Sequence, residues 1–528
     1  MENNRTFLAI ALVILIWSGY SLLFPPQNIE QNTLSNEKEI AIQNNDKKDV
    51  VINKISEVKT NELESKNIEE KTLIVESDIY KYSLSSKGAK ISSAVLKKYK
   101  KENEKNSSFV DIVGSDNKKH FTFKTFGKED LFFSDDIIYN VEKYINEDGQ
   151  SVKFFTETNT GLFLVKTFRF YNDNYEIDIN TKIINNSSEI KRGFFNISLV
   201  NYWEEERKGD TYNFVGPTSL VGEELIEDDP DDIETSSKTY KQNVIWSGFF
   251  TKYFASILSP SDDSSQKLQI EMGEGFIENI FSSPYLTLGP TEGVVYDYVA
   301  FMGPKDYDIL SSVGHHFEKA IDFGFFSILA KPLMVALKFF YKYLGNWGFA
   351  IVLLTVCIKA IFWPLTQKSY SSMKAMQKLQ PQMTRLREKY SSDKQRLNQE
   401  MMSLYKENRV NPFGGCLPML IQIPVFFALY QVLLGSIELR HAPFVFWLTD
   451  LSAKDPYYIT PLVMGATMFL QQKMTPTTME PMQAKMMMMM PVVFTFLFLN
   501  FPSGLVIYWL VNNVLTIAQQ YLINKNPA

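Results

Sequence analysis

Five long apolar runs fill the last third of this 528-residue chain, and they constrain its fold more than any other feature. A membrane-spanning helix needs about 20 predominantly apolar residues, and in hydrocarbon its backbone polar groups must find partners within the helix. The runs therefore predict five membrane helices, at 346–366, 413–435, 457–473, 486–500 and 505–523.

A sixth apolar run, Phe7–Phe24, follows Arg5 near the start of the chain. The alternative reading is a cleaved signal peptide, but no small-residue cleavage site follows the run. We therefore expect a membrane anchor at 1–24. No Lys or Arg follows until Lys38, which predicts a cytoplasmic N-terminus. Residues 25–71 are polar and poor in aromatics, so we expect a disordered linker there.

Residues 72–320 have the pattern of a large all-β domain. Tyr175–Ile179 alternates apolar and polar side chains, as a half-buried strand does. The strands expected at Ile137–Ile145 and Val152–Thr156 flank Asp148-Gly149, a favourable hairpin turn. Many short runs of this kind predict an antiparallel sandwich. Glu223–Glu234 carries eight acids without EF-hand spacing, which favours a solvated loop over a calcium site.

Residues 323–345 indicate an amphipathic helix. Leu329, Leu333, Ala336, Leu337, Phe340 and Leu344 would share one face, opposite a stripe formed by Lys331, Lys338 and Lys342. A lysine stripe against a wide apolar face is typical of a helix in the plane of the membrane surface. The alternative is a helix packed on the β domain.

Residues 367–412 are strongly basic. They hold ten Lys or Arg and four acids, a charge of +6 against −12 for the remainder of the chain. Apolar residues at three-to-four spacing on both sides of Tyr390–Asp393 predict two helices joined by a turn, a basic hairpin on the cytoplasmic side. Its charge suits lipid headgroups or ribosomal RNA, or serves topology alone. The contact residues that we expect are Met373, Met376, Met383, Arg385, Arg387 and Met401.

Polar side chains interrupt the apolar runs. Lys359 lies in the stretch VCIKAIFWP, with Thr355 one turn earlier on the same face. Other polar residues in the runs are Gln422, Gln431, Asn512, Asn513, Gln519 and Gln520. Each one alone is explained by snorkelling or by hydrogen bonds between helices. Together they predict a wet cavity open to the cytoplasm, because polar groups in membrane helices usually face a bundle interior or water.

The sequence contains no HExxH, GxSxG, P-loop or GxGxxG motif. His315 and His316 are adjacent, which does not suit a shared metal ion, so we expect no metal and no cofactor. Two rival functions remain. A channel or secondary transporter would explain intramembrane polar residues, but no internal repeat is visible and no acid lies in the core runs. A Ser/Lys protease would need a serine at the depth of Lys359.

Several of these stretches resemble the YidC family of bacterial membrane protein insertases (Oxa-type superfamily), in its long Gram-negative form. They are GNWGFAIVLLTVCIKAIFWPLT, SMKAMQKLQPQM, DKQRLNQEMMSLYKENRVNPFGGCLPMLIQIPVFFALY, LSAKDPYYITP and MMPVVFTFLFLNFPSGLVIYWLVNN. The strong similarity covers 346–523. The resemblance implies a periplasmic β-supersandwich and a five-helix core with a positively charged hydrophilic groove, closed to the periplasm. It identifies an insertase and folding chaperone of the inner membrane rather than an enzyme.

The groove positions that the resemblance implies are Lys359, Thr355, Gln422, Ile423, Phe426, Tyr508, Trp509 and Asn512. The family usually carries Arg where this chain has Lys359, so the charge is kept while the planar guanidinium fork is lost. The chain ends at Asn524-Lys525-Asn526-Pro527-Ala528, without the basic tail of some members. The implied partners are nascent membrane proteins, the Sec translocon with its accessory subunits, ribosome and signal-recognition components, and lipids.

Overall fold

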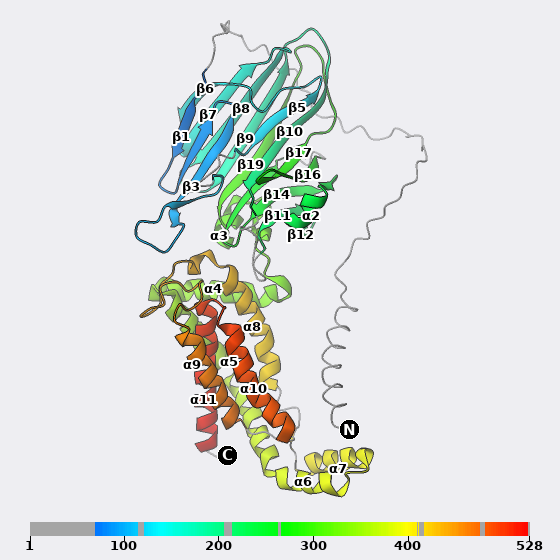
Figure 1. Ribbon diagram of the computed structural model, residues 1–528, viewed down its shortest axis with the longest axis vertical. Helices are drawn as coiled ribbons and strands as arrows, with labels where there is room; N and C mark the ends of the chain where they lie inside the picture. Colours follow the sequence, from blue (N-terminus) through cyan, green and yellow to red (C-terminus); the bar gives the residue numbers. More distant parts are fainter. Residues whose placement is uncertain are drawn as a thin grey trace, which may run out of the picture. The chain divides into compact units, whose positions relative to one another are not determined.

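The computed structural model describes residues 69–114, 121–204, 214–261, 266–408, 410, 417–475 and 481–525. The expected anchor at 1–24 and the expected linker up to residue 68 lie outside these ranges. Strands dominate the described residues up to Pro304, and helices follow from Tyr307 onwards (Figure 1).

The strands form three antiparallel sheets. The nine-stranded sheet has the order β12-β11-β14-β15-β19-β9-β8-β7-β6. Its members are β6 (Asn140–Ile145), β7 (Gly149–Glu157), β8 (Leu162–Tyr171), β9 (Glu176–Asn185), β11 (Gly216–Val221), β12 (Glu224–Glu227), β14 (Val244–Phe250), β15 (Phe254–Pro260) and β19 (Gly293–Pro304).

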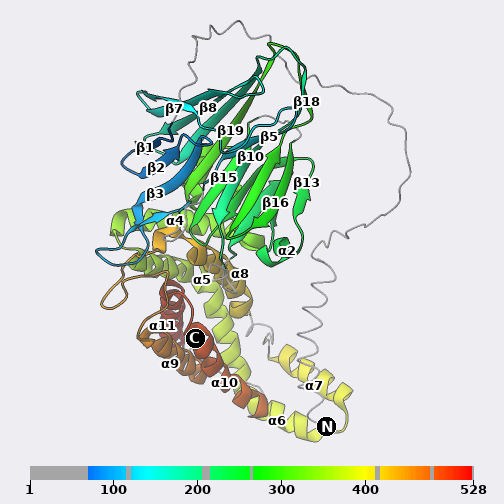
Figure 2. The ribbon, with the colours of Figure 1, turned by 45° about the horizontal axis from the view of Figure 1, so that its top comes forward.

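The six-stranded sheet has the order β13-β16-β17-β10-β18, with β5 also paired to β10. It comprises β5 (Lys124–Glu129), β10 (Lys191–Tyr202), β13 (Lys238–Tyr240), β16 (Lys267–Gly273), β17 (Phe276–Ser282) and β18 (Leu286–Leu288). The third sheet joins β1 (Thr72–Glu76), β2 (Tyr80–Ser85), β3 (Lys90–Lys100) and β4 (Phe109–Asp111) in sequence order. Figure 2 shows the two larger sheets face to face, and one hydrophobic core joins side chains of all three. The predicted sandwich is confirmed.

Two local predictions are also confirmed. β6 and β7 form the expected hairpin, with Ile145 opposite Gln150. β9 alternates buried and half-buried side chains along most of its length, as the pattern at Tyr175–Ile179 predicted. The acidic stretch differs from the expected loop, because it contains β12 and the short helix α2 (Pro230–Thr235). Asp229 caps α2 by accepting from the backbone N–H of Asp231, and Pro230 occupies the first turn, where its missing N–H is harmless. No group of metal ligands lies among the described residues.

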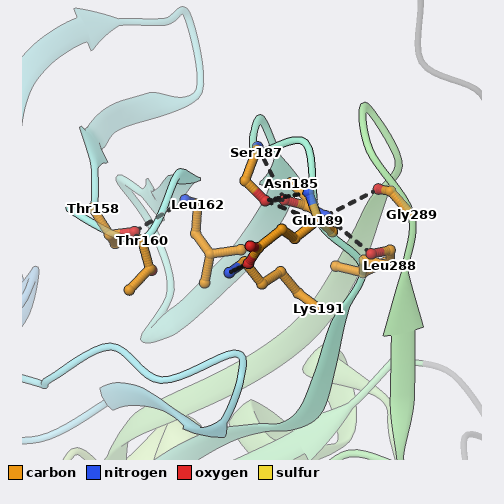
Figure 3. Close-up of polar contacts among 9 residues, drawn as sticks. All are labelled: Thr158, Thr160, Leu162, Asn185, Ser187, Glu189, Lys191, Leu288 and Gly289. Atoms are coloured by element: carbon orange, nitrogen blue, oxygen red, sulfur yellow. Dashed lines mark hydrogen bonds and ion pairs between the residues drawn. The ribbon is translucent and has the colours of Figure 1, made fainter.

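Asn185 anchors one end of the sandwich (Figure 3). Its buried amide donates to the carbonyls of Glu189, Leu288 and Gly289 at 2.7, 3.0 and 3.2 Å. Its Oδ1 accepts from the backbone N–H and the hydroxyl of Ser187. One side chain thereby ties the turn between β9 and β10 to β18.

The helical part follows. It comprises α3 (Tyr307–Val313), α4 (Ser327–Leu344), α5 (Trp347–Lys378), α6 (Gln380–Lys389), α7 (Lys394–Glu407), α8 (Leu417–Gly435), α9 (Ile459–Met474), α10 (Pro481–Phe498) and α11 (Ser503–Lys525), with 3-10 turns η2 (Phe317–Ala320), η3 (Gly324–Phe326) and η5 (Ile437–Leu439). By length and composition, Gly324–Leu344 and Trp347–Lys378 could cross a membrane, while Ile421–Gly435 and Met486–Phe498 are shorter apolar helices.

Helix α4 runs across the ends of α5 and α8, against both of which it packs (Figure 1). Its inner face buries Ala330, Met334 and Leu337, while Ile328 and other apolar side chains of the outer face are exposed. The expected lysine stripe is corrected at one position. Lys338 turns inward and forms ion pairs with Asp306, Asp308 and Glu438 at 3.3, 2.8 and 2.8 Å.

Helix α5 is longer than the expected span. It continues to Lys378 without a break, so the first part of the basic hairpin is an extension of this helix. No Gly or Pro occurs between Leu365 and Leu379 to end it. α6 begins at Gln380, with Pro381 in its first turn. Asp393 caps α7 by accepting from the N–H of Arg396 at 3.0 Å, directly after the turn that the sequence predicted at Tyr390–Asp393.

Candidate functional site

The centre of the candidate site is Lys359, two-fifths of the way along α5. The helix begins next to Asn346, whose side chain caps it by accepting from the N–H of Phe349. Lys359 is half-buried, and its ammonium donates to Thr516 Oγ1 of α11 at 2.8 Å. Thr516 is buried, and its hydroxyl donates a hydrogen bond to the carbonyl of Asn512 at 2.7 Å. A positive charge is therefore held between two apolar helices by a neutral acceptor.

The contact between α5 and α11 continues about two turns further along α5 and about one turn further along α11. Thr366 and Gln519 are both buried, and their side chains exchange hydrogen bonds of 3.1 and 2.8 Å. Lys359, Thr516, Thr366 and Gln519 form what we call the polar seam. Such hydrogen bonds between membrane helices are worth about 1 kcal/mol each.

The opposite edge of α11 is pinned to α9. Asn513 donates to Thr467 at 3.3 Å, and Gln520 donates to Thr475 at 3.1 Å. Both α11 side chains are buried. These bonds agree with the alternative explanation of the polar residues, in which they form hydrogen bonds between packed helices. Lys359 differs from them because it carries a charge, which helix packing alone does not require.

A second centre lies between α8 and α11. Gln422 donates to the hydroxyl of the buried Tyr508 at 2.5 Å. Phe426 meets Trp509 edge to face, with ring centroids 4.8 Å apart. Tyr508 and Thr516 are eight residues apart on α11, so this centre lies about 12 Å from the polar seam at ~1.5 Å per residue.

The remaining expected groove residues take different positions. Thr355 is buried, and its hydroxyl donates to Ile351 of its own helix at 2.7 Å, so it does not hold Lys359. Asn512 is buried, with its side-chain oxygen unpartnered among the described residues. Ile423 is exposed on α8. Of the eight expected residues, the structure therefore brings together Gln422 with Tyr508 and Phe426 with Trp509, while Lys359 is paired with Thr516.

The expected contact residues of the basic hairpin differ in their burial. Met383 is buried with Leu379 and Leu404, and half-buried Met401 packs against this cluster. Met373 is also buried, at the end of α5 that bears the hairpin. Met376 and Arg387 are half-buried, whereas Arg385 and Met402 are exposed. Met383 fills the interior between α6 and α7, because two short helices need a hydrophobic core of their own.

Sequence reasoning missed Thr516 and Thr366. Threonine is common in membrane helices, where it often bonds its own backbone, so neither residue attracted attention. The available signal was spacing. Asn512, Thr516 and Gln519 recur at four and three residues and share one face of α11, which faces α5.

Comparison with known proteins decides the family. The profile described as YidC periplasmic domain matches residues 72–336, and the profile described as 60Kd inner membrane protein matches residues 339–528. The protein named membrane protein insertase YidC of Geotalea daltonii is 43% identical over 544 residues, which cover 99% of each chain. The chain belongs to the YidC family of membrane protein insertases.

Another YidC relative, from Geobacter sulfurreducens, is 45% identical over 456 residues, or 85% of each chain. A crystal structure described as active YidC insertase with the first transmembrane domain resolved has 17% identity and a TM-score of 0.37, covering 86% of this chain and 93% of that one. YidC proteins are membrane protein insertases rather than enzymes, as the resemblance implied.

Proposed function

We propose that this chain inserts nascent membrane proteins through a hydrophilic groove lined by its expected groove residues. These are Lys359, Thr355, Gln422, Ile423, Phe426, Tyr508, Trp509 and Asn512. The observation that carries the proposal is the ammonium of Lys359, held inside a helix bundle by Thr516 with no carboxylate partner among the described residues. A buried charge without a counterion is costly, so a polar or acidic ligand would stabilise it.

The groove lowers the free-energy barrier for moving polar residues of a substrate into the membrane. A substrate segment that carries polar residues pays a large desolvation penalty when it enters hydrocarbon directly. A half-way site with a positive charge and hydrogen-bonding side chains takes those residues while the apolar part of the segment enters lipid. Tyr508, Trp509 and Phe426 form the second centre, about 12 Å along α11 from that site at ~1.5 Å per residue.

The topology and partners belong to the same proposal. The N-terminus, the basic hairpin and the C-terminus lie in the cytoplasm, and the β domain lies in the periplasm. The basic hairpin receives substrates from ribosome and signal-recognition components, and the insertase acts alone or with the Sec translocon. The charge of +6 on residues 367–412 supports this orientation by the positive-inside rule.

Substitutions of Lys359 test the groove. In cells depleted of their own insertase, Lys359→Arg should support insertion at nearly the level of the parent chain. Lys359→Ala should reduce it about tenfold, as expected for the loss of ~1.4 kcal/mol of charge stabilisation, and Lys359→Glu should reduce it further. Equal and full activity of the Ala and Glu variants would refute a role for the charge.

A flux assay separates the insertase from the channel alternative. Vesicles that contain the purified protein should stay impermeable to small ions in the absence of substrate. Steady ion flux that Lys359→Ala alters would favour a channel and count against the groove proposal.

A further inference from the structure

A charged cleft of about 180 Å³ opens away from the polar seam, at the far end of α8. One wall belongs to the β domain and carries Glu227, Lys252 and Lys305. The other wall includes Met334 of α4 and the last residues of α8, Gln431 to Gly435. A water molecule needs roughly 10–15 Å³ of such volume, so the cleft has room for a polar group of several atoms.

The charges of the cleft nearly balance. Lys252 and Lys305 face Glu227 and Asp322 across it. A fifth charged residue, Glu438, also lines the cleft but is occupied by its 2.8 Å ion pair with Lys338. Two positive and two negative side chains remain for a ligand. That balance favours a zwitterion over an anion or a cation.

Lys305 has no ion-pair partner among the described residues. Its ammonium lies 5.0 Å from the ring centroid of Phe250, and no carboxylate lies within 4 Å of it among the described residues. Burial lowers the pKa of Lys305 to about 8, and nearby Glu227 offsets part of that effect. Burial likewise raises the pKa of Glu227. Burial thus disfavours the charged form of both groups, and a ligand that pairs with each would offset this cost.

One side of the cleft is apolar. Met334, Val432 and Leu434 line it. Around the same helix, Ile328 and Val335 are exposed on the outer face of α4, with exposed fractions of 84% and 65%. A surface of this kind lies against lipid when the helix is at a membrane boundary. Met334 in the apolar lining of the cleft and this exposed face therefore belong to the same helix, α4.

We propose that this cleft binds the headgroup of a phosphoethanolamine lipid from the outer leaflet of the membrane. The phosphate accepts hydrogen bonds from Lys305 and Lys252, and the ammonium donates to Glu227 and Asp322. The glycerol and upper acyl chains follow Met334 and Val432 toward the exposed face of α4. The site rests on the placement of α4 at the membrane surface and is independent of the groove.

The chemistry distinguishes this lipid from its neighbours. A phosphocholine headgroup has the same charges but no N–H donors for the two carboxylates. A phosphoglycerol headgroup supplies the phosphate but leaves Glu227 and Asp322 unpaired. Charge-assisted hydrogen bonds are the stronger kind, so the ethanolamine headgroup should be preferred.

Native mass spectrometry of the full-length protein in neutral detergent tests the site. With equal mixtures of the three lipids, phosphoethanolamine lipid should be retained about fivefold better than the others, a ratio that corresponds to charge-assisted hydrogen bonds partly screened by water. Lys305→Met or Glu227→Gln should abolish that preference. The double variant Glu227→Gln with Asp322→Asn leaves two positive charges and should switch the preference to the phosphoglycerol lipid.

Two control variants each remove one charged side chain near the cleft, one positive and one negative. Lys342→Met on α4 and Glu224→Gln on β12 lie outside the cleft, and both side chains are exposed. They should leave the preference unchanged, and thermal unfolding should show that all variants are folded. Equal retention of the three lipids by the parent chain would overturn the proposal, as would a preference that survives Lys305→Met and Glu227→Gln.

Two further arms identify the source of the ligand. Soluble phosphoethanolamine at the lipid concentration should compete weakly, because it lacks the acyl chains; full competition would overturn the assignment to a membrane lipid. A photocrosslinker at Gln431 should capture lipid. If it captures polypeptide instead, the cleft is a protein-binding site. Insertion activity is not measured in either arm, so these outcomes are independent of the groove.

Discussion

The β domain and the helical part of this molecule each hold a lysine away from bulk water, but in different environments. The two residues are Lys166 and Lys359. Lys166 lies in β8 at an inward-facing position between Leu164 and Phe168, and only 1% of its surface is exposed. It donates to the carbonyl of Phe123 and lies 5.0 Å from the ring centroid of Phe168. Lys359 is half-buried and donates to a side chain of a neighbouring helix. The first lysine is sealed in the sandwich, and the second borders a proposed groove.

The β domain encloses its lysine almost completely, whereas the helical part holds polar side chains at contacts between helices. In the β domain, burial holds the pKa of Lys166 well below its usual value, and the positive charge of Lys90 adds to the effect. A sealed amine of this kind cannot take part in binding. In the helical half, several polar side chains bond to neighbouring helices, so their partners can be exchanged when helices separate. We therefore expect damage to the helical half to affect insertion, and damage to the β domain to affect stability.

The largest expected effect comes from removing the basic hairpin. Replacing residues 375–408 by a short linker should abolish insertion, because the hairpin is proposed to capture substrates before the groove does. Crosslinking of a nascent chain to groove position Gln422 should disappear with it. Protease resistance of the remaining helices checks their fold, and normal crosslinking at Gln422 without the hairpin would show that capture does not depend on it.

The next effect concerns Thr516. Thr516→Val keeps the shape of the side chain but removes the acceptor for Lys359. A hydrogen bond to a charged group is worth about 1.5–3 kcal/mol, and partial replacement by water should leave a loss of roughly threefold to tenfold in insertion. Thr516→Ser retains the hydroxyl and should behave as the parent chain does. If Val and Ser behave alike, Thr516 does not position Lys359.

A smaller effect, on stability, is expected at Lys166. Its folded-state pKa is depressed, so the folded state binds fewer protons than the unfolded state over the range between the two pKa values. Stability at this residue is therefore greatest above the unfolded pKa of about 10.4 and falls as the pH is lowered toward the folded value.

Lys166→Met removes this penalty but leaves the Phe123 carbonyl without its partner, so we expect a net gain of about 1 kcal/mol near pH 7. The gain should shrink as the pH approaches 10.5. Thermal unfolding of the full chain at several pH values measures it. A gain that does not change with pH would mean that the amine is charged in the folded protein.

The smallest effect on insertion should follow deletion of the β domain. Removing residues about 75–310 leaves the groove residues and the basic hairpin in place. Insertion should therefore fall less than about twofold, which corresponds to a free-energy change below ~0.4 kcal/mol. The deletion also removes Asp306 and Asp308, which pair with Lys338, so the amount of membrane-integrated protein must be measured alongside. A stable truncated chain that inserts nothing would place the function differently.

Much of the fold was predictable because its signals are local. Alternation over Glu176–Asn185 and the Asp148-Gly149 turn each fix a strand or a hairpin within a few residues. The order of the strands in three sheets was not predictable, since β10 pairs with β17, β18 and β5 across long sequence separations. Those pairings depend on side-chain fit across sheets, which no single stretch reveals.

The candidate site was predictable as residue types and not as contacts. Lys359 is conspicuous because a charge in an apolar run is rare. Its partner Thr516 is 157 residues away and has an unremarkable identity for a membrane helix. Lys338 was misplaced for a related reason. A helical pattern gives the face on which a lysine lies, whereas its acceptors come from α3 and η5, outside the helix.

The uninterrupted α5 has a mechanical consequence. Its 32 residues make a rod of about 48 Å at ~1.5 Å per residue, against roughly 30 Å for the hydrocarbon of a bilayer. A rod of that length amplifies small rotations: tilting it by about 10° about its α4 end displaces its far end, where α6 begins, by roughly 8 Å. Lys359 and the start of the hairpin lie on this one helix, on either side of Pro364, so a change of tilt or a bend at that proline would move one relative to the other. The arrival of a substrate at the hairpin would then be coupled through α5 to a rearrangement around Lys359.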